Sequence, residues 1–144
     1  MSHPAADMQR QLIADLFAQV LNAHRPDRAD AFYRQDYVQH NPDVAQGLVG
    51  LKEFLVGLNQ AFPDIHGEIL FGLAEADRVM VQVDWTGTHQ GSLFGLPATG
   101  KAVKFRSAET FRVQGGLVAE HWDVVDNVEM QLALGLLHRG AGPR

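Results

Sequence analysis

The residues best suited to chemistry lie near the C-terminus, in the stretch AEHWDVVD at positions 119–126. This stretch follows two glycines and has the composition of a β-strand. Side chains on a strand alternate between two faces, so His121 and Asp123 must share a face. A carboxyl in a dry pocket can remove or return a proton, because apolar surroundings raise its pKa toward neutral pH. The pair is a candidate acid/base site.

The strand before the two glycines carries polar residues on an otherwise apolar face. Over residues 103–113, Ser107 and Glu109 fall in phase with the apolar positions. An unpaired buried carboxylate destabilises a protein, so a carboxyl at such a position either is paired with another group or has a function. Glu109 is therefore a second candidate for acid/base chemistry, with Ser107 beside it.

The hairpin turn at residues 115–116 decides which of these groups meet. Shifting strand pairing by one residue moves every side chain to the opposite face. If the loop has two residues, Glu109 lies opposite Trp122. His121 and Asp123 then point to the other face, and the cluster does not form.

A three-residue loop that includes Gln114 gives the other register. Such a loop needs a left-handed residue at its last position, which a glycine supplies. Glu109 then lies opposite His121. Ser107 lies opposite Asp123, on the same face. We favour this register because it pairs a carboxylate with a histidine and leaves the rest of the face apolar.

The periodicity of apolar residues predicts an α+β fold. Helical spacing covers residues 7–24 and 48–62, with a short helix from Pro26 that turns Ala31 and Phe32 inward. A period of two predicts strands at residues 65–74, 79–86, 103–113 and 117–125, preceded by a short extended piece at 37–39 and followed by a helix at 128–137. We expect about three N-terminal helices packed on one side of a curved antiparallel sheet.

Length and charge narrow the class of protein. The 144 residues suit a single domain, 1–144, with frayed tails at 1–6 and 139–144. The net charge of -5 argues against nucleic acid and anionic membrane surfaces as partners. The first residues show no basic start followed by an apolar stretch, and no long apolar run occurs elsewhere, so we expect a cytoplasmic protein that binds no membrane.

Residues 95–101, GLPATGK, match the start of a phosphate-binding loop. Ala102 stands where that loop needs a hydroxyl, and a strand follows in place of a helix. We therefore interpret this segment as a connection between strands.

Three motifs resemble the SnoaL-like polyketide cyclases, also called ester cyclases, within the nuclear-transport-factor and ketosteroid-isomerase superfamily. They are YVQHNP at 37–42, GTHQG at 87–91 together with 95–101, and EHWD at 120–123 ahead of an apolar helix. The resemblance implies a cone-shaped sheet wrapped around the helices and enclosing an apolar cavity. It also implies a homodimer formed through the outer face of the sheet.

The resemblance implies chemistry as well. The cyclases close a polyketide ring by intramolecular aldol condensation without a cofactor, and their general acid/base aspartate matches Asp123. The facing strand in the cyclases holds Gln and His where this chain has Ser107 and Glu109. This departure bears on the identity of the natural substrate.

The sequence thus favours a cofactor-independent enzyme that acts on a small carbonyl or polycyclic compound, with Asp123, Glu109 and His121 as catalytic residues and no metal. The predicted substrate-binding residues are His40, Asn41, Ser107, Trp85, Phe54, Phe62, Phe94 and Phe105. Two alternatives stay open: an isomerase or epoxide hydrolase on the same fold, and a non-catalytic domain that binds a small ligand.

Overall fold

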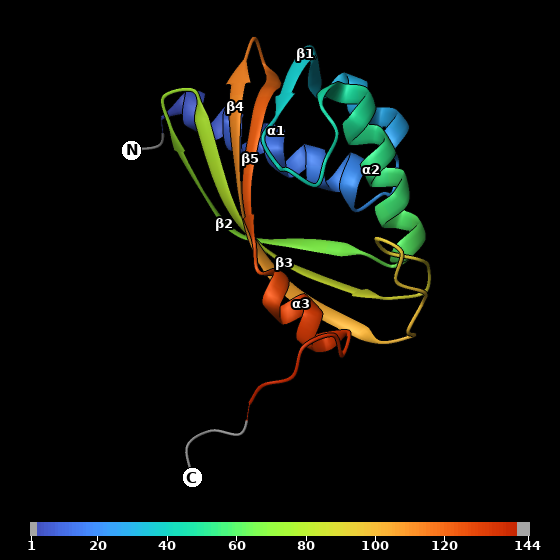
Figure 1. The fold of residues 1–144 in the computed structure, drawn as a ribbon. Helices are drawn as coiled ribbons and strands as arrows, with labels where there is room; N and C mark the ends of the chain where they lie inside the picture. The colour runs from blue at the N-terminus through green and yellow to red at the C-terminus, as the bar shows by residue number, and fades with distance from the viewer. Residues whose placement is uncertain (1–2, 141–144) are drawn as a thin grey trace.

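The computed structural model describes residues 3–140 and confirms the α+β class (Figure 1). A single curved sheet has the strand order β1-β5-β4-β3-β2. The strands are β1 (Tyr33–Gln39), β2 (His66–Glu75), β3 (Arg78–Thr88), β4 (Ala102–Gln114) and β5 (Leu117–Val125). β2 to β5 are antiparallel neighbours, but β1 pairs with β5 in parallel. The sheet is therefore mixed. β1 comes from the helical half of the chain, and a long connection separates it in sequence from β5, its neighbour at the edge of the sheet.

The helices follow the predicted order with shifted ends. They are α1 (Pro4–Leu16), continued by the π-helical turn η1 (Phe17–Leu21), the 3₁₀ helix η2 (Pro26–Ala31), α2 (Gly47–Ala61) and α3 (Asn127–Ala133). Residues 4–6, which we expected to be frayed, are helical, and residues 1–2 and 141–144 of the predicted tails lie outside the described residues. In η2 the inward residue is Ala29, whereas Ala31 is exposed. No helix in residues 3–140 is long and apolar enough to cross a membrane.

Two hydrophobic clusters hold the helices against the sheet. The main one joins α1 and η1 to the middle of the sheet, with Ile13, Leu16 and Val83 fully buried. Each such side chain contributes about 1.5–3 kcal/mol by leaving water. A second cluster around Phe62 and Leu134 joins the end of α2 to α3. α1 and α2 lie on the concave side of the sheet, while α3 lies at the end away from the β4–β5 turn (Figure 1).

The β4–β5 hairpin has the two-residue turn that we did not favour. Gln114 pairs with Leu117, and both turn glycines, Gly115 and Gly116, have positive φ angles of 62° and 75°. This is the type I′ geometry that matches the twist of a hairpin without an extra residue. The predicted three-residue loop is therefore wrong.

A β-bulge corrects the effect of the short turn. Val113 pairs with Val118 but Arg112 pairs with Glu120, so Ala119 is an extra residue on β5. Beyond it the pairing has moved by one position, and Glu109 lies opposite Asp123. The expected cross-strand partners were wrong, but the expected shared face is present.

Candidate active site

A pocket of about 400 Å³ lies between the concave face of the sheet and α2. This volume falls in the range of small-molecule sites. All five aromatic residues that we predicted as walls line it: Phe54, Phe62, Trp85, Phe94 and Phe105. The polar residues Gln39, Asn41, Glu109, His121 and Asp123 line it as well. The pocket therefore combines apolar walls with one group of convergent polar side chains.

His121 is held at both ring nitrogens, and its tautomer follows from its partners. Nδ1 lies 3.0 Å from Oε1 of Gln39, and Nε2 lies 2.6 Å from Oε2 of Glu109. The same Gln39 atom receives the backbone N–H of Asn41 at 2.9 Å, so it must be the carbonyl oxygen. Nδ1 therefore carries a proton and donates it to Gln39.

Glu109 accepts hydrogen bonds from two sides. The indole N–H of Trp85 can only donate, and it donates to the Ser107 hydroxyl at 2.8 Å. The hydroxyl in turn donates to Oε1 of Glu109 at 2.6 Å. The short contact with Nε2 of His121 needs a proton between the two groups. Glu109 and His121 thus share one proton, and the pair is neutral as a whole whichever atom holds it.

Asp123 is half-buried beside this pair. The side-chain amide of Asn41 donates to its Oδ2 at 2.7 Å, while Oδ1 forms no hydrogen bond within residues 3–140. Burial raises the pKa of Asp123, and the nearby charge of Glu109 raises it further, whereas the hydrogen bond from Asn41 lowers it. The arrangement leaves one carboxylate oxygen available to a ligand in the pocket.

The sequence analysis missed three residues on β1. Tyr33, Tyr37 and Gln39 are buried, whereas Gln35 between them is exposed because the pairing of β1 with β5 is irregular there. Gln39 orients His121, and its amide nitrogen donates to the Tyr37 hydroxyl at 2.7 Å. Tyr33 lines the pocket, and burial together with the charge of Glu109 raises its pKa. The two tyrosines, a residue type common in strands, were a signal, but we predicted the strand only for residues 37–39.

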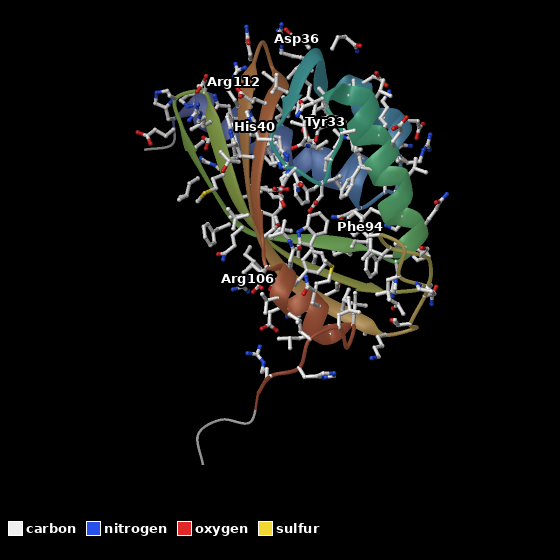
Figure 2. All side chains as sticks on the ribbon, viewed as in Figure 1. Tyr33, Asp36, His40, Phe94, Arg106 and Arg112 are labelled. Atoms are coloured by element: carbon white, nitrogen blue, oxygen red, sulfur yellow. The ribbon has the colours of Figure 1, made fainter. Side chains whose placement is uncertain are left out.

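Two predicted substrate-binding residues lie elsewhere. His40 is exposed on the outer face of the sheet, where it contacts Glu120 and stacks on Trp122 with ring centroids 4.7 Å apart (Figure 2). It follows Gln39 directly, so the strand alternation turns it away from the pocket. Ser107 is buried behind Glu109 and does not line the pocket. Neither His40 nor Ser107 thus lines the pocket, and Ser107 contacts the pocket residue Glu109.

The same three groups could be considered as metal ligands. Atoms of Glu109, His121 and Asp123 lie within 4.8 Å of one another. Both nitrogens of His121 are already engaged, by Gln39 and by Glu109. A metal would have to break one of these bonds to use the ring. The geometry as built is better suited to holding and moving a proton.

Comparison with known proteins agrees with this fold. No curated protein gives a significant match. AclR from Streptomyces galilaeus, a candidate hydroxylase, is 28% identical with a TM-score of 0.83, over 92% of this chain and 99% of that one. A candidate polyketide cyclase from Acidithiobacillus ferrooxidans is 25% identical with a TM-score of 0.78, over 88% of this chain and 94% of the other.

A candidate SnoaL-like polyketide cyclase from Jannaschia sp. CCS1 shares the fold with a TM-score of 0.84, at 20% identity over 96% of this chain and 99% of that one. The model of the family described as SnoaL-like polyketide cyclase matches residues 11–134. That match covers both the helical half and the sheet. The chain belongs to the SnoaL-like polyketide cyclase family.

Proposed function

We propose that this protein is an enzyme that closes a ring in a small carbonyl compound by an intramolecular aldol-type condensation, with Asp123 as general acid/base. The observation that carries the proposal is the state of the Asp123 carboxylate. One oxygen is fixed by Asn41 and the other is free in a mainly apolar pocket. Burial and Glu109 raise the pKa of Asp123, which strengthens it as a base.

The proposed reaction needs no redox step and no cofactor. Asp123 removes a proton from the carbon beside a carbonyl, leaving an enolate. The enolate carbon attacks a second carbonyl of the same molecule, so a carbon–carbon bond forms and the carbonyl oxygen becomes an alkoxide. Asp123 returns its proton to that alkoxide. Every atom of the substrate is kept in the product, and the Glu109–His121 pair keeps Asp123 beside a second, shared proton.

The charges around the pocket favour an uncharged substrate. Its titratable lining residues are Tyr33, Asp43, Glu109, His121 and Asp123, and the part of the chain that the structure describes adds no lysine or arginine. A carboxylate or phosphate group would be repelled here. Trp85 and Phe105 stack with their ring planes 15° apart, which offers walls for a flat ring. We therefore expect a flat, uncharged carbonyl compound.

Proton exchange tests this function without the natural substrate. A naphthyl methyl ketone in deuterium oxide should exchange its methyl protons faster with the protein than in buffer, as followed by proton NMR. Exchange requires a base beside the carbonyl, which is the first step of the proposed reaction. A rate no higher than that of the Asp123→Asn variant would instead favour a domain that only binds its ligand.

The rate of exchange should depend on pH in a defined direction. Only ionised Asp123 can accept the proton, so the rate should fall as pH falls through its raised pKa. The Asn41→Ala variant removes the hydrogen bond that lowers this pKa. Its acidic limb should therefore lie at higher pH than that of the wild type. An unchanged limb in a pH series measured by NMR would show that Asn41 does not act on Asp123.

We also propose a homodimer through the outer face of the sheet. Exposed apolar residues lie there in two neighbouring cross-strand rows. One row contains Phe71 and Val124, and the other contains Leu73, Met80 and the half-buried Trp122. Several exposed apolar side chains on one face of a sheet are typical of an interaction site.

Light scattering after size exclusion tests the homodimer. The wild type should have twice the mass of one chain, and Val124→Glu should have the mass of one chain, because a charge would be buried in the interface. Met8→Glu is the control, since Met8 is 74% exposed on α1, away from the sheet. A wild-type monomer, or a dimer that survives Val124→Glu, would contradict this interface.

A further inference from the structure

The loop between β3 and β4 carries a phenylalanine in a strained conformation. Phe94 has a φ of 46° and Gly95 a φ of 82°. Leu93 and Leu96 exchange two backbone hydrogen bonds around them, at 3.0 and 2.8 Å. The four residues form a two-residue turn of type I′, in which Asn-Gly is the most favoured pair. A bulky side chain in the left-handed region destabilises the fold.

The side chain of Phe94 is not packed into either hydrophobic cluster, so packing does not offset this strain. It is 74% exposed and lies outside both hydrophobic clusters, although its neighbours Leu93 and Leu96 pack against one of them. It does line the pocket. Figure 2 shows it on the loop beside the C-terminal end of α2. An exposed aromatic ring is thus held at the edge of the pocket by a backbone that would be more stable with another residue.

The rest of the loop forms a fixed base for this turn. His89 is completely buried, and its Nδ1 accepts the backbone N–H of Thr99 at 3.2 Å. The backbone N–H of Gly91 donates to the carbonyl of Ala61 at the end of α2. A Cβ on Gly91 would lie only 2.1 Å from a carbonyl oxygen of α2, so only glycine permits this approach. The loop therefore presents Phe94 from a defined position.

We propose that Phe94 is the specificity-determining cover of the pocket, whose ring packs on a flat, uncharged ring compound and leaves water only when the ligand is bound. This inference rests on the proposed function in taking the pocket as the ligand site, but it needs no proton transfer by Asp123. The strain is kept because contact between the two rings stabilises the complex, while the free protein would be more stable without it.

Phe94→Asn separates binding from folding. It creates the most favoured pair for this turn, so the midpoint of thermal unfolding should rise by about 2–5 °C. The probe for binding is prodan, a flat, uncharged naphthyl ketone whose fluorescence changes in apolar surroundings. Titration should show about tenfold weaker binding to the variant, because the ring contact is lost. We therefore expect Phe94→Asn to raise the unfolding midpoint and to lower the affinity for prodan.

Two further variants complete the experiment. Ala76 also has a positive φ, of 53°, and lies exposed in the β2–β3 turn away from the pocket. Ala76→Asn should therefore raise the unfolding midpoint without changing prodan affinity. Phe94→Leu keeps an apolar side chain but removes the ring, so it should bind prodan several-fold more weakly than the wild type.

Three results would overturn the proposal. Prodan affinity of Phe94→Asn within about twofold of the wild type would show that the ring does not cover the ligand. A lower unfolding midpoint would show that Phe94 supports the loop. Failure of the wild type to bind prodan would exclude a flat, uncharged ring ligand. The titration measures binding and involves no proton transfer, so its result stands even if the acid/base proposal fails.

Discussion

Replacing Asp123 by asparagine should lower the rate of proton exchange at the ketone by about 10²–10⁴-fold, the usual contribution of a positioned general base. Asparagine has nearly the same shape, and its amide oxygen can still accept the hydrogen bond from Asn41. The variant therefore removes the proton acceptor and leaves the pocket in place. NMR exchange rates at neutral pH, compared with the wild type, measure the loss.

Asp43 provides the matched control for this variant. It lines the same pocket, but its contact with Asn41 is made by its backbone N–H and not by its carboxylate. Asp43→Asn should therefore change the exchange rate by less than about threefold, well below the contribution of a general base. Equal losses in the two variants would contradict a specific role for Asp123 and would indicate a general effect of pocket charge.

The same Asp123→Asn variant should be more stable than the wild type at neutral pH. The pKa of Asp123 is raised in the folded protein, so folding favours its protonated form. The stabilising effect of that form is present at low pH and is lost as pH rises through the folded pKa. The variant should thus unfold at a higher temperature near pH 7, and the difference should vanish on acidification.

Replacing Glu109 by leucine should lower the free energy of unfolding by about 2–4 kcal/mol, because two buried polar groups lose their partner. The Ser107 hydroxyl would have no acceptor, and Nε2 of His121 would have no group with which to share its proton. Glu109 is 7% exposed and His121 is 9% exposed, so water could not replace the lost bonds freely. Urea unfolding of the purified variants measures this change.

Glu109→Gln is the control that isolates the hydrogen bonds from the charge. Its amide oxygen can accept from Ser107, and its amide nitrogen can donate to Nε2 of a neutral His121. The variant should stay within about 1 kcal/mol of the wild type. If leucine and glutamine destabilised the protein equally, the negative charge and not the bonding pattern would hold this end of the pocket together.

The amino-acid sequence was sufficient to predict which polar residues share a face within each strand, but not that the faces of β4 and β5 meet. Glu109 breaks the apolar phase of its strand, and such a break is visible in the alternation alone. His121 and Asp123 share a face for the same local reason. Phe54 and Phe105 reach the pocket because they lie on the inward stripes of their elements. These features depend only on periodicity within one element.

Features that depend on contacts between distant elements could not be predicted in the same way. The parallel pairing of β1 with β5 brings Gln39 to His121, across 82 positions of the chain. No local pattern shows that contact. His40 was assigned to the pocket because it begins a turn next to Asn41, but the strand continues through Gln39 and directs the histidine outward. The bulge at Ala119 also depends on how two strands twist together.

The bulge at Ala119 shows that the face to which His121 and Asp123 point depends on the number of residues in the β4–β5 hairpin. Each residue added or removed moves these side chains to the opposite face. A two-residue turn alone would direct His121 and Asp123 outward, and the additional Ala119 turns them back. Adding or removing one residue in the turn, or losing the bulge, would exchange the inner and outer faces of β5. Two such changes together would cancel. An insertion or deletion in this hairpin therefore preserves the active site only if a second one-residue change restores the register, although the turn itself is fully exposed to solvent.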